Sequence, residues 1–249
     1  MTRLLVINPN TSDSVSALLQ AHVSALAGPQ VEVTTVTARL GAPYIANESG
    51  YAVAGHAVLD AWAAALVPPA EAPDAVLIGC FGDPGLFALR ECSPQPVTGL
   101  AEAAFAQAAR HGRFAVVTGG AAWDPMLRRF AWSLGCGEAL AGVVTVAPSG
   151  ARLAEDPDGA QALLLEACHR AAALEGVRSV IVGGAGLAGM ASMLQPHLSV
   201  PLIDSVAAGT EEILRALAAG EAAQGRHSIA GCDVRWSGVS AELRALGLA

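Results

Sequence analysis

Cys80 combines a reactive side chain with a position from which it can meet a substrate. An apolar run over residues 75–79 precedes it, and a turn with the sequence Phe-Gly-Asp-Pro-Gly follows over residues 81–85. A cysteine that only fills a core needs no such turn, whereas the end of a strand is where α/β proteins usually bind their ligands. This placement predicts that the thiol does acid–base or nucleophilic chemistry.

The turn after Cys80 bears on how the thiol becomes reactive. The turn leads into a helical stretch, and a helix N-terminus lowers the pKa of a nearby thiol, so we expect the pKa of Cys80 to be lowered. Asp83 has two interpretations. It initiates the turn before Pro84, which we favour, or it orients an N–H group of a substrate.

Two other turns carry groups that suit a ligand. Asn10 lies in Asn-Pro-Asn-Thr-Ser over residues 8–12, where free N–H groups at a helix start attract a carbonyl oxygen or an anion; plain helix capping is the alternative. Thr118-Gly119-Gly120 is the counterpart in the second half of the chain, and its glycines let the backbone approach a ligand closely.

A glycine-rich turn over residues 183–189 contains a Gly-x-Gly-x-x-Gly pattern that starts at Gly184, with Asp204 about 20 residues later. This pattern is typical of dinucleotide binding. The internal repeat described below explains the turn equally well and places it opposite Cys80, so we favour the second explanation.

Composition excludes several classes of protein. The 249 residues carry a net charge of -8, which argues against a nucleic-acid binder, and no apolar stretch is long enough to predict a membrane span. The first residues read as a strand rather than a signal peptide, which predicts a cytoplasmic protein with reduced thiols. Cysteine and histidine show no metal-like spacing, so we expect no metal site. The remaining cysteines, taken as structural or incidental, are Cys92, Cys136, Cys168 and Cys232.

Short apolar runs alternate with alanine-rich helical stretches, which is typical of an α/β fold with parallel, buried sheets. The predicted strands cover residues 3–8, 31–37, 75–79, 114–118, 142–147, 178–183 and 200–203. The predicted helices cover residues 12–27, 51–66, 99–111, 123–135, 158–175 and 204–219.

An internal repeat divides the chain. Three landmarks recur in the same order 104 to 110 residues later, among them residues 74–80, which match residues 178–184. We therefore predict two similar, doubly wound lobes related by a pseudo-two-fold axis, with the active site between them. The first lobe would hold residues 1–110 with part of 204–249, and the second would hold residues 111–203. The carboxyl ends of corresponding strands then share one cleft.

These motifs together resemble the aspartate/glutamate/hydantoin racemase superfamily, most of all its hydantoin and allantoin racemase branch. The resemblance spans roughly residues 3–220. It is carried by residues 7–12, 79–86, 116–118, 183–189 and 200–204, of which Cys-Phe-Gly-Asp-Pro-Gly is the most specific part.

The resemblance implies a cofactor-independent enzyme, commonly an oligomer, that works with one cysteine on each face of a small-molecule substrate. Cys80 matches the first family cysteine, and Asn10 and Thr118 match positions that line the pocket. The second cysteine should stand at Gly184, and glycine cannot carry a proton. The predicted substrate-binding residues are Asn10, Phe81, Gly82, Thr118, Gly119, Gly184, Ala185 and Gly186.

Three functions remain open on the sequence. The favoured one is a racemase-like enzyme that moves a proton at the carbon next to a carbonyl of a cyclic ureide, such as a 5-substituted hydantoin or allantoin. The second is a one-cysteine decarboxylase, lyase or isomerase of the same fold. The third is a relative that binds such a ligand without catalysis. In the first case a replacement for the missing acid, such as Ser192, His197 or a water, has to lie opposite Cys80.

Overall fold

The computed structural model of the protein describes residues 1–67, 71–147, 157–220 and 236–246, and Cys232 lies outside them. The strands are β1 (Thr2–Asn8), β2 (Val31–Thr37), β3 (Ala75–Ile78), β4 (Val97–Gly99), β5 (Phe114–Gly119), β6 (Leu140–Val146), β7 (Ser179–Gly183) and β8 (Leu202–Asp204). The α-helices are α1 (Asp13–Ala27), α2 (Glu48–Ala65), α3 (Leu86–Cys92), α4 (Leu100–Ala109), α5 (Trp123–Ser133), α7 (Pro157–Ala172), α8 (Met190–Leu194), α9 (Ser205–Ala218) and α10 (Ala241–Leu246). Two 3₁₀ helices, η1 (Ala185–Leu187) and η2 (Gln195–His197), flank α8.

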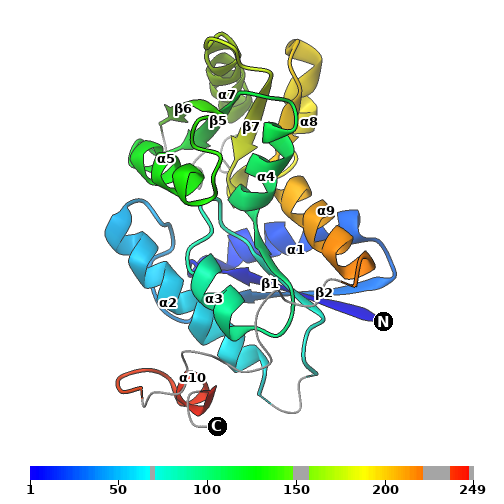
Figure 1. Ribbon diagram of the computed structural model, residues 1–249, viewed down its shortest axis with the longest axis vertical. Helices are drawn as coiled ribbons and strands as arrows, with labels where there is room; N and C mark the ends of the chain where they lie inside the picture. Colours follow the sequence, from blue (N-terminus) through cyan, green and yellow to red (C-terminus); the bar gives the residue numbers. More distant parts are fainter. Residues whose placement is uncertain (68–70, 148–156, 221–235, 247–249) are drawn as a thin grey trace.

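Two parallel four-stranded sheets form the framework, in the orders β2-β1-β3-β4 and β6-β5-β7-β8. The two orders are the same when each strand of the first sheet is replaced by its counterpart four strands later. The predicted α/β fold with two similar lobes is therefore confirmed, and Figure 1 shows one lobe above the other.

The inner strands form where the sequence is continuously apolar. Every residue of β3, β5 and β7 is buried, because helices cover both faces of each sheet. The edge strand β2 is covered less completely, and Glu32 and Thr34 are exposed on it. The apolar runs thus form the centre of each sheet, which is β1 and β3 in the first sheet and β5 and β7 in the second.

Helices α4 and α9 join the lobes. They pack against each other, and each touches strands of both sheets: α4 contacts β7 and β8 as well as β4, and α9 contacts β3 and β4 as well as β8. In Figure 1 both helices lie between the upper and lower sheets. The predicted division into residues 1–110 with part of 204–249, and 111–203, stays a prediction, because these two helices serve both lobes.

Several short elements differ from the sequence prediction. β4 is a strand of three residues that the apolar pattern did not mark, and α3 and α8 are helices of fewer than eight residues that follow the two glycine-rich turns. Helix α2 begins at Glu48 rather than residue 51, because the Asn47 side chain accepts a hydrogen bond from Gly50 N (2.9 Å) and caps it. None of the helices in the described ranges has the length and apolar character needed to cross a bilayer.

Candidate active site between the two lobes

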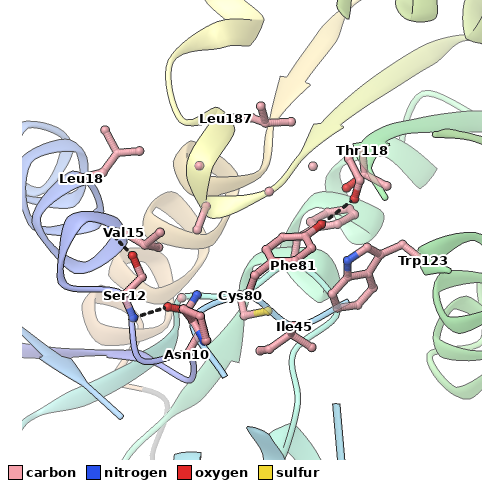
Figure 2. A pocket seen from close by; sticks show the side chains of 18 of the residues that line it. Asn10, Ser12, Val15, Leu18, Ile45, Cys80, Phe81, Thr118, Trp123 and Leu187 are labelled. Carbon is pink, nitrogen blue, oxygen red and sulfur yellow. Dashed lines mark hydrogen bonds between the residues drawn. The ribbon is translucent and has the colours of Figure 1, made fainter. Parts of the chain in front are cut away.

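A cavity of about 620 Å³ lies where strands of both sheets end. It brings Cys80 together with seven of the eight predicted substrate-binding residues, and Figure 2 shows many of these side chains around it. The predicted residues that line it are Asn10, Phe81, Thr118, Gly119, Gly184, Ala185 and Gly186. Gly82 does not line it: the Trp123 ring covers this glycine, and a Cβ atom there would lie 2.5 Å from a ring carbon.

Cys80 lies two residues after the end of β3 and is almost fully buried at the cavity wall, with 9% of its surface exposed. Gly79 lets the strand end close to α1, since a Cβ atom at this position would lie 2.6 Å from Cδ1 of Leu19. The backbone N–H of Asp83 donates a hydrogen bond to the carbonyl oxygen of Cys80 (3.1 Å) and closes the turn. The thiol is therefore held at one end of the cavity by a rigid turn.

The expected lowering of the Cys80 pKa is wrong for the ligand-free protein. Burial raises the pKa of this thiol well above its ordinary value, and the nearby carboxylate of Asp83 raises it further. The helix after the turn, α3, begins only at Leu86 and does not offset the loss of water. Cys80 thus rests as a neutral thiol that carries a proton.

Asn10 presents a hydrogen-bond donor to the cavity. Its Oδ1 accepts hydrogen bonds from Asn8 Nδ2 (3.0 Å) and from Ser12 N (2.9 Å). Asn8 Nδ2 also donates to Ser12 O and Ser16 Oγ, both at 3.0 Å, which fixes the orientation of the network. Among the described residues nothing accepts a hydrogen bond from Asn10 Nδ2, so this group is available to a ligand. Capping of α1 falls to Ser12, which confirms the capping interpretation of this turn. Binding of a ligand there stays a prediction.

The second lobe contributes glycine backbone to the cavity around Gly184, where no acidic side chain of a described residue is present. Gly184 has φ +145°, a conformation that L side chains rarely adopt, and its N–H donates to Ser205 Oγ (3.2 Å). Phe81 reaches across from the first lobe and packs on Gly183, where a Cβ atom would lie 2.3 Å from the ring. The cavity wall therefore carries no side chain at Gly184, the position where the resemblance predicts a second cysteine.

The proposed replacements for that cysteine do not meet at the cavity. Ser192 and His197 are absent from the residues that line it, and Ser192 Oγ donates to the carbonyl oxygen of Gly189 (2.8 Å).

Asp204, the acidic residue of the dinucleotide pattern, is held by hydrogen bonds within the protein. Its carboxylate accepts hydrogen bonds from the backbone N–H groups of Gly189, Val206 and Ala207, so it caps α9 and holds the glycine-rich turn.

Sequence reasoning missed part of the cavity wall. The loop after β2 contributes Tyr44 and Ile45, and Tyr44 Oη donates to the carbonyl oxygen of Gly119 (2.9 Å) in the other lobe. Pro43 of the same loop also lines the cavity. The missed lining residues from other elements are Ser12, Ser14, Val15, Leu18, Gly79, Trp123, Gly183 and Leu187. One signal was available for the loop: it follows a parallel strand, and the carboxyl ends of such strands meet at one edge.

The part of the cavity wall formed by the described residues carries no formal charge. None of the described residues that line it is Asp, Glu, Lys, Arg or His. A ligand with a carboxylate would find no cationic side chain there to pair with it. The site is therefore suited to a neutral, polar ring with carbonyl and N–H groups.

Comparison with known proteins agrees with this geometry. A sequence model described as Asp/Glu/hydantoin racemase matches residues 4–213. The chain belongs to this family. Its membership supports an enzyme of the racemase or isomerase type, built from two lobes with the cavity between them.

Relatives within the Asp/Glu/hydantoin racemase family include two hydantoin racemases. That of Rhizobium meliloti is 33% identical over 87% of this chain and 89% of its own, and that of Paenarthrobacter aurescens is 30% identical over 83% and 87%. The solved structure of allantoin racemase from Klebsiella pneumoniae has a TM-score of 0.86 at 31% identity, and the match covers 99% of both chains. Arylmalonate decarboxylase, at 21% identity with a TM-score of 0.58 over 88% of this chain and 94% of its own, shares the fold.

Proposed function

We propose that this protein is a cofactor-independent, racemase-like enzyme that transfers a proton at the carbon next to a carbonyl of a cyclic ureide of the hydantoin or allantoin type. The observation that carries the proposal is the Cys80 thiol, buried at the wall of a cavity between two racemase-type lobes whose described lining residues include no other cysteine and no charged side chain. Cys80 serves one face of the substrate. The names of the relatives support the substrate class.

The polar groups of the cavity suit the charge that develops in such a reaction. Removing the proton next to a carbonyl moves negative charge onto the carbonyl oxygen. The Asn10 Nδ2 group is a fixed donor for that oxygen, and the backbone around Gly119 and Gly184–Gly186 admits close approach of the ring. A donor held in place before the reaction stabilises the enolate without reorganising.

A neutral ring is favoured over an amino acid with two carboxylates. The lining combines the polar side chains of Asn10 and Thr118 with the apolar side chains of Val15, Leu18 and Leu187, and it lacks a cation. An apolar substituent on the ring therefore finds a matching wall, whereas a carboxylate would lose its water without compensation. As the resemblance implies, we expect a homo-oligomer, and we expect it in the cytoplasm.

Two observations favour a second candidate, a one-cysteine decarboxylase, lyase or isomerase of the same fold. Gly184 supplies no acid to the opposite face, and burial keeps the Cys80 thiol protonated. A protonated thiol is ready to give its proton to a carbanion left by loss of carbon dioxide or by breakage of a carbon–carbon bond. Cys80 would then act as an acid on one face.

The test is to incubate single enantiomers of a 5-substituted hydantoin and of allantoin with the protein in deuterium oxide. Chiral separation with mass detection then follows each enantiomer. We expect protein-dependent deuterium in the opposite enantiomer, which would establish racemisation and a second acid other than cysteine. Deuterium only in the starting enantiomer would mean one-faced proton exchange.

Absence of any protein-dependent exchange would reject the ureide proposal. A reaction without protein corrects for spontaneous exchange. Release of carbon dioxide from an arylmalonate-type diacid would then support the decarboxylase, and ligand binding without exchange or release would support a non-catalytic relative.

The pH dependence separates the two catalytic candidates. If Cys80 acts as a base, the working form is the thiolate. Because burial and Asp83 raise the pKa of this thiol, the thiolate fraction should grow about tenfold per pH unit from pH 6 to 9 without a plateau. If Cys80 acts as an acid, the working form is the thiol, and kcat/KM should stay level over this range. The measurement is kcat/KM for exchange, or for carbon dioxide release, at each pH.

A further inference from the structure

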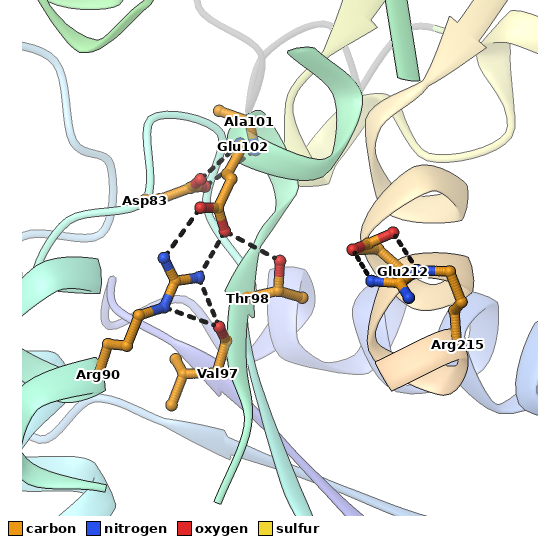
Figure 3. A network of polar contacts seen from close by, with 8 residues as sticks. All are labelled: Asp83, Arg90, Val97, Thr98, Ala101, Glu102, Glu212 and Arg215. Carbon is orange, nitrogen blue, oxygen red and sulfur yellow. Dashed lines mark hydrogen bonds and ion pairs between the residues drawn. The ribbon is translucent and has the colours of Figure 1, made fainter. Parts of the chain in front are cut away.

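Asp83 lies directly behind the catalytic turn and is almost completely buried, with 1% of its surface exposed. It is the one non-glycine residue with positive φ among the described residues, at +51°. Its carboxylate accepts two backbone hydrogen bonds, from Ala101 N (2.9 Å) and from Glu102 N (2.7 Å). Both donors belong to the first turn of α4, as Figure 3 shows. Asp83 thus has a left-handed backbone conformation, which is unfavourable for residues other than glycine, and its carboxylate binds the N-terminus of α4.

The start of α4 is built to receive that carboxylate. The N-cap residue, Gly99, has no side chain and makes no side-chain cap of its own. A Cβ atom at Gly99 would lie 2.1 Å from Cγ of Asp83, so only glycine leaves room. The corresponding helix of the second lobe, α9, is capped by its own residue Asp204, which also binds Gly189 N in the turn after β7.

Both lobes therefore tie the turn after their third strand (β3 or β7) to the helix after their fourth strand (α4 or α9) through one carboxylate. In the second lobe the helix carries the carboxylate, at Asp204. In the first lobe the turn carries it, three residues after Cys80, and the N–H of the same residue donates to Cys80 O. The two lobes thus differ in one respect: the carboxylate of the first lobe belongs to the turn that carries Cys80.

The groups that face Asp83 come from three helices and the turn itself. Arg90 of α3 pairs with Glu102 of α4 (2.6 Å), and Tyr51 of α2 donates from Oη to the carbonyl oxygen of Gly82 (2.8 Å). Burial raises the pKa of the Asp83 carboxyl to about 7, the two backbone N–H groups oppose this, and the charges of Glu102 and Arg90 act in opposite directions. Asp83 in turn raises the pKa of both Tyr51 and Cys80, to which burial contributes most.

We propose that Asp83 is a positioning residue for Cys80: it fixes the turn that carries the thiol against α4, and it keeps a buried carboxylate three residues from the thiol. Burial opposes ionisation of the thiol most, and the Asp83 carboxylate, when ionised, adds to that effect. The proposal rests on the proposed function for the use of the thiol, but not for its ionisation. A plain helix cap would explain the two hydrogen bonds without any effect on the thiol, so the ionisation of Cys80 is the property that separates the two explanations.

The test measures the rate of Cys80 alkylation by iodoacetamide against pH in the ligand-free protein, with mass-spectrometric peptide mapping to separate Cys80 from the other cysteines. Asp83→Asn keeps the size and removes the charge. We expect the midpoint of the profile to fall by about one pH unit, so that alkylation at a fixed pH below the midpoint is about tenfold faster. A looser turn would instead raise the plateau rate at high pH and leave the midpoint in place.

The matched control is Asp204→Asn, which removes the equivalent carboxylate from the second lobe, whose described cysteines do not line the cavity. Each variant loses an acceptor for backbone N–H groups, and we expect each to lower the melting temperature by about 3–6 °C. Only Asp83→Asn should move the Cys80 midpoint. An unchanged midpoint in Asp83→Asn, or an equal shift in both variants, would reduce Asp83 to a helix cap and overturn the proposal.

The wild-type profile keeps the proposal testable if Asp83→Asn does not fold. We expect its midpoint above about 8.5, the ordinary value for a cysteine. A wild-type midpoint at that ordinary value would show that neither burial nor the charge of Asp83 opposes ionisation, and it would overturn the proposal. Because alkylation needs no substrate, a failure of deuterium exchange would reject the ureide function and leave this result standing.

Discussion

Replacing Cys80 by serine is expected to abolish protein-dependent deuterium exchange into a hydantoin or allantoin substrate. A positioned acid–base group contributes about 10²- to 10⁴-fold to a rate, and a serine hydroxyl is a far weaker acid than a thiol. No other side chain with an ordinary pKa near neutrality lines the cavity within the described part of the chain. We therefore expect kcat/KM for exchange to fall at least about 10³-fold.

The fold should survive this substitution, because serine is close to cysteine in size and the thiol makes no hydrogen bond on which the turn depends. Cys136→Ser is the matched control: Cys136 is half-buried, its Sγ donates to Ala131 O, and it does not line the cavity. Exchange should persist in the control. Unfolding of Cys80→Ser, measured by melting temperature, would mark the thiol as a core residue and contradict the site assignment.

Installing a thiol on the opposite face is the second large expected effect. In Gly184→Cys we expect deuterium in the opposite enantiomer to increase at least about tenfold, because each face then has an acid–base group. Space is available, since the nearest atoms to a Cβ at this position, other than those of its chain neighbours, are Cγ and Cδ1 of Leu187 at 3.5 and 3.6 Å. The measurement is the ratio of labelled enantiomers from a single-enantiomer start in deuterium oxide.

The backbone conformation at Gly184 should make this variant less stable. Its φ of +145° is unfavourable for any residue with a Cβ, so the free energy of unfolding should fall by about 1–3 kcal/mol. Gly184→Ala carries the same strain without a thiol and should lose stability without gaining exchange on the second face. If Gly184→Cys folds and shows no gain over Gly184→Ala, the second face of the substrate does not lie at this residue.

The lobes follow from local patterns along the chain. Runs such as residues 75–79 and 178–183 are apolar throughout, and a run of that kind in an alternating chain folds into a strand covered on both faces. The internal match between them predicted two like sheets before any contact was known. β4 escaped this reasoning, because its three residues form a strand only by pairing with β3.

The sequence predicts those parts of the candidate site that lie at the ends of strands. Cys80, Asn10 and Thr118 each lie at or just after the carboxyl end of a parallel strand, and such ends share one edge. Gly82 was placed in the cavity wrongly because its neighbour Trp123 comes from the other lobe, about 40 residues away in sequence. Tyr44 was missed for the same kind of reason, since its partner Gly119 belongs to the other lobe.

The sequence by itself determined the two-lobe α/β plan, with a cysteine in the turn after β3 and a glycine in the turn after β7, because these depend on residue types and on periodicity that neighbours in the chain create. Only the tertiary structure decided the state of the thiol. The pKa of Cys80 depends on burial by elements distant in sequence and on the carboxylate of Asp83. That carboxylate is in turn held by the start of α4, 18 residues further along the chain, and no local pattern records such a contact.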